Sequence, residues 1–348
     1  MKQFMSFVVG VLAVLLVSFR ALAAPAGWQQ IKPGGDTLCA RGGEYSFLVR
    51  NGDPQKILVS FAGGGACWDD MTCEEGGPFT DTAERTFTQV EKGQGVYNFK
   101  DPRNPYRDWT HVFVPYCTGD VHVGQGDNTY THMDNTPYVI HHRGGINVKS
   151  VLQWLQAHYK SPAELGVNGC SAGSYGSILW TPALAKLYPQ AKINQLGDSG
   201  AGVTDSLFFP QWHLEPSFPA WIPSLDPSRV DWKKLTIVDI YNEIAKHYPQ
   251  ARFSQFNHLK DRVQIMYYAA LGGNGLDWTQ RMYSNMVSMA TASPNFHFFV
   301  APGDQHCATT TSHLYNTQTD GVSLDQWIRQ GISGQNVENV KCKECKIR

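Results

Sequence analysis

The feature that most constrains the fold is a run of small residues, Gly169-Cys170-Ser171-Ala172-Gly173, set between an apolar stretch and a helical one. The apolar stretch covers Glu164–Asn168, and the helical pattern covers Ala172–Tyr188. A buried strand can turn sharply into a helix only where the flanking residues are small, because strand and helix then approach closely. The run therefore predicts a strand–turn–helix unit that lifts the Ser171 side chain clear of a sheet.

Similar units recur along the chain. Apolar runs bounded by Gly or Pro predict buried strands, and they cover residues 56–62, 111–116, 164–168, 192–196, 252–257 and 295–301. Helical periodicity covers residues 148–159, 172–188, 237–248 and 278–290. Pro182 is expected to kink or break the second of these helices. The alternation predicts an α/β fold with a mostly parallel sheet covered by helices on both faces. Residues 24–348 contain no linker or low-complexity stretch, so they are predicted to form one domain.

Residues 1–23 have the pattern of a signal peptide. Lys2 supplies the positive charge, Phe7–Val17 forms a short apolar core, and Ala21-Leu22-Ala23 provides the small residues of a cleavage site. The apolar core is too short to cross a bilayer comfortably, and an uncleaved anchor is the alternative. We therefore expect cleavage near Ala23, a secreted or periplasmic protein, and no membrane span in the mature chain.

Charge and cysteine content exclude several classes of function. The formal charge at pH 7 is −1, so there is no basic excess to attract nucleic acid. All eight cysteines lie beyond residue 23, and an even number in an exported chain favours disulfides. Only Cys342 and Cys345 have the spacing of metal ligands, and no second such pair exists. No metal site is predicted.

Two backbone turns predict a site for nucleophilic catalysis. The run around Ser171 has the G-x-S-x-G form of a nucleophile elbow, in which the next backbone N–H, that of Ala172, faces the developing oxyanion. A glycine-rich turn follows the strand at 56–62, and in this type of fold such a turn supplies the other oxyanion donors, here from Gly64 and Gly65. A phosphate-binding loop is excluded because no Gly-Lys-Ser/Thr follows. An ordinary tight turn is the structural alternative at both places.

A serine nucleophile needs a base and an acid. His306 follows the last apolar strand, where this type of fold places its histidine, and the other candidates are His141, His142 and His313. The acid is expected after the first or second strand that follows the strand carrying the serine. Asp198 and Asp261 both lie at such positions. Asp277 is a third candidate, but Asp277-x-x-Gln280 has the spacing of a helix capping box.

Six segments in order resemble the pectin acetylesterase family, which includes the Notum-like serine carboxylesterases. The resemblance covers roughly residues 45–310, and Ala66 and Trp68 depart from the family pattern. The matching segments are Gly63-Gly64-Gly65-Ala66-Cys67-Trp68, Arg143-Gly144, Gly169-Cys170-Ser171-Ala172-Gly173, Asp198-Ser199-Gly200, Asn257-x-x-x-Asp261-x-x-Gln264 and His306-Cys307. The resemblance implies that Asp261 is the catalytic acid, with Asp198 and then Asp277 as alternatives.

The same resemblance implies an α/β-hydrolase fold and an esterase without a cofactor. Its expected reaction is release of an acetyl or another small acyl group from an O-acylated saccharide, through an acyl-enzyme on Ser171. One alternative is a general carboxylesterase or lipase-like hydrolase that acts on lipid or aryl esters. The other is a catalytically inactive, secreted carbohydrate-binding protein, against which an intact Ser171, Asp261 and His306 set argues.

The cysteines beside the proposed nucleophile and base predict a further link between them. The order Cys-Ser…Asp…His-Cys resembles the tannase and feruloyl esterase family, in which a disulfide ties the triad together, and this implies a bond from Cys170 to Cys307. If Ser171 and His306 meet, their neighbours are expected to be close as well. Cys67–Cys73 is expected as a local pair, Cys342–Cys345 as another, and Cys39–Cys117 by elimination. Two buried free thiols at 170 and 307 are the alternative.

Overall fold

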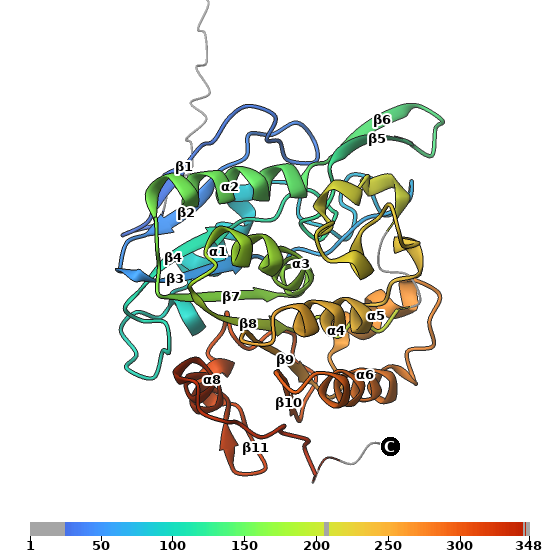
Figure 1. Cartoon of the computed structure of the whole chain (residues 1–348). Helices are drawn as coiled ribbons and strands as arrows, with labels where there is room; N and C mark the ends of the chain where they lie inside the picture. The colour runs from blue at the N-terminus through green and yellow to red at the C-terminus, as the bar shows by residue number, and fades with distance from the viewer. Residues whose placement is uncertain (1–24, 205–208, 344, 346–348) are drawn as a thin grey trace, which may run out of the picture.

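An eight-stranded, mostly parallel sheet organises the computed structural model, which describes residues 25–204, 209–343 and 345 (Figure 1). The strand order is β1-β2-β4-β3-β7-β8-β9-β10. Strands β3, β4 and β7–β10 are parallel to their neighbours in this set, whereas β2 is antiparallel to both β1 and β4. The bounds are β1 Gln29–Ile31, β2 Phe47–Arg50, β3 Asp53–Phe61, β4 Trp109–Val114, β7 Glu164–Cys170, β8 Lys192–Asp198, β9 Arg252–His258 and β10 Phe296–Ala301. The predicted signal peptide at 1–23 lies outside the described residues.

Burial explains why the six predicted strands were visible in the sequence. Every residue of β4 is buried, and β7, β8 and β9 are each buried at all but their first residue. Successive side chains of a strand face opposite sides of the sheet, so complete burial requires cover on both faces. The mostly parallel, helix-covered sheet expected from the sequence is thereby confirmed.

Helices follow the parallel strands and pack against them. Helix α3 contacts β3, β7 and β8, α4 contacts β9, and α6 contacts β10. The α-helices are α1 Ala83–Glu91, α2 Gly144–His158, α3 Ala172–Leu187, α4 Ile237–His247, α5 Arg262–Ala270, α6 Trp278–Ala292, α7 His313–Asn316 and α8 Leu324–Ser333. Short 3-10 helices cover Gly95–Tyr97, Pro210–Trp212, Glu215–Ser217, Pro223–Leu225 and Trp232–Lys234. Among the described residues, no helix has both the length and the apolar character needed to cross a membrane.

Pro182 does not break α3, so the expectation of a break was wrong. The helix continues past it to Leu187. The turn that contains the proline is buried, with Ile178, Leu179 and Trp180 each no more than 3% exposed. Tertiary packing of this turn against the sheet therefore outweighs the local cost of about 3 kcal/mol that a proline imposes inside a helix.

Two small antiparallel sheets and four disulfides complete the described structure. The hairpin of β5 (Gly126–Thr131) and β6 (Pro137–His142) projects beside the helical layer, and β11 (Gln318–Thr319) pairs with β12 (Val322–Ser323) (Figure 1). The disulfides join Cys39 to Cys117, Cys67 to Cys73, Cys170 to Cys307 and Cys342 to Cys345.

The parallel strands bring the candidate residues to one edge of the sheet. Strand β7 ends at Cys170, immediately before Ser171, and its neighbour β8 ends at Asp198. Asp261 lies three residues beyond the end of β9, and His306 lies five beyond the end of β10. The carboxyl ends of adjacent parallel strands meet at a common edge, where α/β proteins bind their ligands.

Candidate active site

Ser171 occupies a sharp turn between β7 and α3. Its backbone has φ 58° and ψ −123°, a conformation that costs free energy for a residue with a side chain. The turn is held because the Ser171 N–H donates to the carbonyl of Asp198 over 2.8 Å. A Cβ on Gly169 would collide with the carbonyl of Gly173, and a Cβ on Gly173 would collide with that of Phe61. The two glycines of the motif thus permit the close approach that the elbow requires.

The glycine-rich turn after β3 lies beside the elbow. A Cβ on Gly63 would lie 2.8 Å from the carbonyl oxygen of Cys170 and 3.0 Å from Cβ of Ser171, so the two turns are in contact. Gly65 has φ 78° and lines the same cavity as Ser171 and Ala172. Gly64 instead packs with its Cα toward Tyr116 and Thr80. Two of the three residues expected to supply oxyanion donors, Gly65 and Ala172, therefore border the cavity directly.

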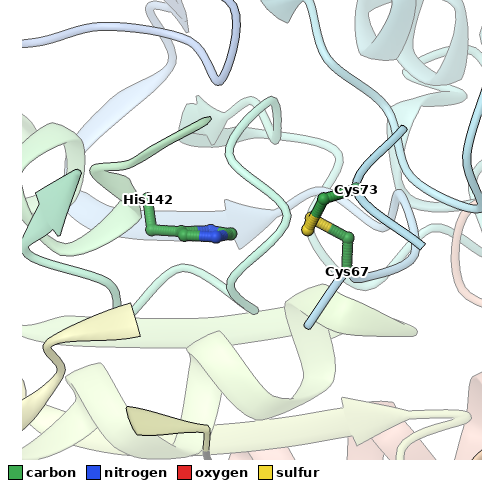
Figure 2. A group of neighbouring side chains, drawn as sticks. All are labelled: Cys67, Cys73 and His142. Carbon is green, nitrogen blue, oxygen red and sulfur yellow. A yellow bond between two sulfur atoms is a disulfide. The ribbon is translucent and has the colours of Figure 1, made fainter. Parts of the chain in front are cut away.

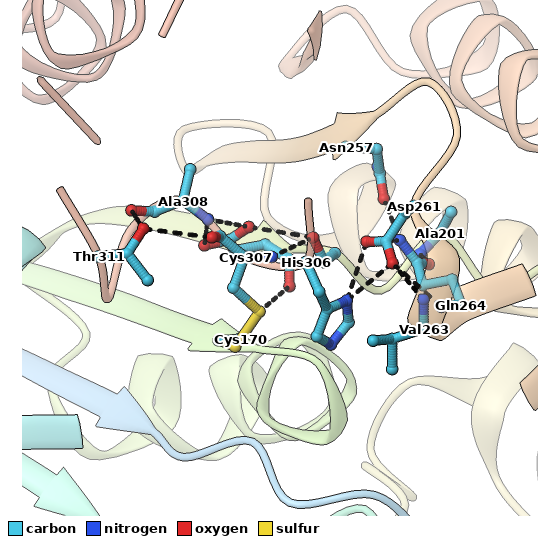
Figure 3. A network of polar contacts seen from close by, with 12 residues as sticks. Cys170, Ala201, Asn257, Asp261, Val263, Gln264, His306, Cys307, Ala308 and Thr311 are labelled. Carbon is cyan, nitrogen blue, oxygen red and sulfur yellow. Dashed lines mark hydrogen bonds and ion pairs between the residues drawn. A yellow bond between two sulfur atoms is a disulfide. The ribbon is translucent and has the colours of Figure 1, made fainter. Parts of the chain in front are cut away.

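Asp261 and His306 form a hydrogen-bonded pair at the cavity wall (Figure 3). Nδ1 of His306 lies 2.9 Å from each carboxylate oxygen of Asp261. Asp261 is completely buried, and the His306 side chain is 20% exposed. Nε2 of His306 is buried without a hydrogen-bond partner among the described residues. Since Nδ1 faces the carboxylate, Nε2 is the nitrogen left to exchange a proton with another group.

Asp261 is held rigidly from its other side. It caps helix α5, where Oδ1 accepts from the N–H groups of Val263 and Gln264 over 3.0 and 3.1 Å. Nε2 of Gln264 donates to Oδ2 over 3.0 Å and also to Oδ1 of Asn257 over 3.0 Å. The orientation of that amide is fixed, because its oxygen accepts from the N–H of Ala201 over 2.8 Å. Figure 3 shows these residues converging on the carboxylate.

These contacts set the ionisation of Asp261. Burial alone would raise the pKa of this carboxyl, but the hydrogen bond and the charge of His306, together with the hydrogen bonds from Gln264, outweigh burial and lower it. The carboxylate form is thus the stable one in the folded protein. A charged Asp261 favours the Nδ1–H tautomer of His306 and leaves the lone pair on Nε2.

Asp198, the second candidate acid, binds the backbone beyond the histidine instead. Its carboxylate accepts from the N–H of Ala308 and Thr309 and from the Thr309 hydroxyl, at 2.5–3.2 Å. Burial raises the pKa of Asp198 against these hydrogen bonds and the charge of His306. Asp198 makes no hydrogen bond to His306 among those found in the structure, so it anchors the loop that carries His306.

The expected capping box at Asp277 is absent, which corrects that interpretation. Asp277 has helical φ and ψ values of −95° and −5°, and its side chain makes no capping hydrogen bond. Its Oδ2 instead accepts from Nε of Arg281 over 3.1 Å. The alternative histidines are also occupied elsewhere or distant: His141 pairs with Asp127, and neither His142 nor His313 lines the cavity of Ser171.

Seven aromatic side chains contribute to the wall of the cavity that Ser171 and His306 share. The cavity measures about 80 Å³. Trp68 stacks on Phe209 with ring centroids 5.5 Å apart, and Trp68 also meets Tyr267 edge-on. Trp212 closes the wall behind Phe209, and its indole N–H donates to the carbonyl of Cys67 over 2.9 Å. The reacting groups thus lie in a small, mainly apolar pocket.

A comparison with known protein families agrees with this geometry. Residues 34–220, slightly more than half of the 348-residue chain, match the family model described as pectinacetylesterase. The chain belongs to the pectinacetylesterase family. The resemblance expected from the six sequence segments is confirmed.

Named relatives of this pectinacetylesterase-family chain are Notum proteins. A palmitoleoyl-protein carboxylesterase, notum2 of Xenopus laevis, is 27% identical over 177 residues, which is 47% of this chain and 34% of the relative. The alignment thus spans about a third of that protein. Two crystal forms of the Wnt deacylase Notum from Drosophila match with TM-scores of 0.60 and 0.58 and 18% identity, covering 88% and 87% of this chain and 93% and 92% of the other. At that identity the match shows the fold, and the α/β-hydrolase expectation is confirmed.

Two groups of side chains in the described part of this family member have the spacing of metal ligands. One is Cys67 and Cys73 with His142 (Figure 2), and the other is Cys170 and Cys307 with His306. In each group the two sulfur atoms are joined in a disulfide. Metals bind the thiolate form of cysteine, so neither group offers sulfur ligands in this state.

Sequence reasoning missed Asp120, which shapes another wall of the cavity. Its buried carboxylate accepts from the Thr118 hydroxyl over 2.6 Å and from the N–H groups of His122, Gly124 and Gly144 at 2.7–3.1 Å. Burial, opposed by these bonds, raises the pKa of Asp120 to about 6. The turn so formed places Val121 in the cavity lining. In the sequence, only the Arg143-Gly144 segment pointed to this part of the fold. Asp120 itself could not be found, because no local pattern marks a carboxylate that binds Gly144, 24 positions away.

The disulfide between Cys170 and Cys307 is expected to stabilise the site. It closes a loop of 137 residues, for which the chain-entropy model gives about 4–5 kcal/mol. Replacing both cysteines by serine should lower the free energy of unfolding by about that amount, measured by denaturant titration. The Cys342→Ser, Cys345→Ser variant is the matched control, since its loop spans three residues and should lose clearly less. Equal losses in both variants would contradict this account.

Gln264 is expected to position the catalytic acid. Gln264→Glu places a second carboxyl beside Asp261, and the added negative charge favours protonated His306. The acid limb of the kcat/KM profile for p-nitrophenyl acetate should therefore move to higher pH, and Gln264→Leu should reduce kcat at least about tenfold through misalignment of the pair. Gln153→Leu, on the exposed face of α2, is the control. Thermal destabilisation with an unshifted pH profile would reduce Gln264 to a structural residue.

Proposed function

We propose that this protein is a serine carboxylic ester hydrolase that removes a short acyl group, such as acetyl, from an O-acylated saccharide. The observation that carries the proposal is the Asp261–His306 pair, because Nε2 of His306 has no hydrogen-bond partner in the described part of the chain and His306 lines the same cavity as Ser171. Membership of the pectinacetylesterase family supports the same reaction class.

In the proposed mechanism, Ser171 attacks the ester carbonyl while Nε2 of His306 takes the serine proton. Ionised Asp261 stabilises the imidazolium that forms. The N–H groups of Ala172 and of the Gly64–Gly65 turn donate to the oxyanion. His306 then protonates the departing alcohol, and a water molecule activated by the same nitrogen releases the acyl group as the acid. Each proton that leaves Ser171 or water passes through one nitrogen, whose orientation Asp261 sets.

The cavity size favours a short acyl group. A water-sized group needs about 10–15 Å³ on the scale used for such cavities, so a cavity of about 80 Å³ accepts several such groups, which suits a short acyl chain. Its aromatic walls suit a methyl or short alkyl group. The Xenopus relative is named for a palmitoleoyl substrate, which makes a long-chain ester the principal alternative to be tested.

Four disulfides support a setting outside the reducing cytosol. Together with the signal-peptide pattern at 1–23, they favour a secreted or periplasmic enzyme. O-acylated polysaccharides are ester substrates that such an enzyme could meet in that setting. An inactive carbohydrate-binding protein is disfavoured, since it would not need to keep a buried carboxylate and a free imidazole nitrogen beside a strained serine.

Ser171→Ala should abolish ester hydrolysis without unfolding the protein. Loss of a catalytic serine typically costs at least about 10⁴-fold in kcat. The assay compares acetate release from O-acetylated pectin with hydrolysis of p-nitrophenyl acetate and p-nitrophenyl octanoate. We expect the wild type to prefer acetyl over octanoyl esters. A variant that retains more than a tenth of wild-type activity would remove Ser171 from the mechanism, and an octanoyl preference would favour the long-chain alternative.

The three candidate acids should separate by phenotype. Asp261→Asn should lower kcat by about 10⁴-fold because the imidazole loses its orienting charge. Asp198→Asn should chiefly lower thermal stability, since an amide cannot accept from all the donors of the Ala308–Thr309 backbone. Asp277→Asn removes a partly exposed ion pair worth at most about 1 kcal/mol, and hydrolysis of p-nitrophenyl acetate should be retained. If Asp198→Asn gave the large kcat loss while Asp261→Asn did not, the assignment of the acid would be overturned.

A further inference from the structure

A second cavity adjoins the one that holds Ser171 and His306. The two cavities share Val203 and Thr204 in their walls. The second measures about 440 Å³, against about 80 Å³ for the first. It lies between the start of α4 and one face of α6, and we call it the polar cleft. Its α6 wall is made by Asp277, Gln280, Arg281, Ser284 and Asn285.

The spacing of these residues shows that α6 has two distinct faces. Trp278, Met282, Met286 and Met289 are buried in the core. Positions 277, 280, 281 and 284 recur at intervals of three and four, so they form a separate stripe along the helix. A polar stripe is commonly only a solvated surface. Here it forms the wall of a cavity that shares Val203 and Thr204 with the cavity of Ser171, which a solvated surface does not require.

Two side chains in the α6 wall of the polar cleft, Asn285 and Asp277, each present a hydrogen-bond acceptor. Nδ2 of Asn285 donates to the carbonyls of Ala201 and Gly202 over 3.1 and 3.3 Å, which fixes its amide and leaves Oδ1 as an acceptor. Oδ1 of Asp277 is buried and has no hydrogen-bond partner, while Oδ2 accepts from Arg281. A buried, unpartnered carboxylate oxygen is costly unless a ligand or water donates to it.

The two cavities match the two halves of an ester in chemistry and size. An acyl group bonded to a carbonyl at Ser171 would fill the small aromatic pocket. The alcohol half then needs space outside that pocket, and the larger polar cleft is a neighbouring cavity that shares two wall residues with it. Amide, hydroxyl and carboxylate side chains that accept and donate hydrogen bonds suit the hydroxyl groups of a sugar, and they suit a lipid or aryl alcohol poorly.

We infer that the polar cleft is the subsite that binds the saccharide half of the substrate, with the 277–285 face of α6 as its specificity-determining wall. This inference rests on the proposed function for the position of the ester. The inference goes beyond the proposed function because it assigns the surface that selects saccharide esters over simple esters. All residues that line the polar cleft belong to the described part of the chain.

Ser284→Tyr tests the assignment because it fills the cleft from an exposed helix position. The matched control is Ser288→Tyr, one turn further along α6, also exposed and outside the cleft. The measured quantity is kcat/KM for O-acetylated pectin oligosaccharides divided by kcat/KM for p-nitrophenyl acetate. We expect this ratio to fall at least about tenfold in Ser284→Tyr and to keep its wild-type value in Ser288→Tyr. A ratio that is unchanged in both, or lowered equally in both, would overturn the inference.

A binding measurement separates failure of the cleft from failure of the proposed reaction. Calorimetric titration of Ser171→Ala with pectin oligosaccharides needs no turnover. The affinity should fall at least about tenfold when Ser284→Tyr is added and should be retained when Ser288→Tyr is added. Equal affinity in the two double variants would exclude the cleft as the saccharide subsite even if ester hydrolysis by the wild type is observed.

Discussion

The buried contact between Asp261 and His306 is the interaction on which the rest of this site depends. A carboxylate without exposure to solvent is unstable unless every lone pair finds a donor. Asp261 meets this demand with two backbone N–H groups, the Gln264 amide and the imidazole. The protein thus stabilises a negative charge in its interior, and that charge determines which nitrogen of His306 faces the substrate cavity.

The surrounding structure serves to keep that imidazole beside Ser171. The loop carrying the histidine is fixed by Asp198 through the backbone of residues 308 and 309, and by the Cys170–Cys307 disulfide through the nucleophile's own strand. The N–H of Cys307 also donates to the Ser199 hydroxyl over 3.0 Å. The elbow follows β7, Asp261 follows β9 and the His306 loop follows β10, while Asp198 follows β8. These four strands are adjacent and parallel, so the relative positions of the groups follow from the register of the sheet. Strain at Ser171, Ser199 and Cys307, all with positive φ, is offset by this network.

The elements that sequence reasoning located are those with continuous burial, because complete cover on both faces produces unbroken apolar runs. It missed the edge strand β1, its neighbour β2 and the β5–β6 hairpin, whose short or alternating patterns resemble loops. The elbow was predictable because only small residues fit there. The choice of Asp261 over Asp198 could not be predicted from local patterns, since both residues follow suitable strands, and it came from the family resemblance. The two carboxylates differ in their partners, which lie 45 residues away for Asp261 and 111 residues away for Asp198. Asp277 shows the limit of local spacing, since Arg281 takes the carboxylate that a capping box would have used.

The proposed mechanism requires that the imidazole oriented by Asp261 activates Ser171. Covalent labelling with a fluorophosphonate, followed by mass spectrometry of proteolytic peptides, tests it most directly because the reagent reacts with serines activated in this way. The account predicts one adduct, on the peptide that contains Ser171, formed rapidly by the wild type and far more slowly by Asp261→Asn. An adduct on another residue, or equal labelling rates for the two proteins, would contradict it.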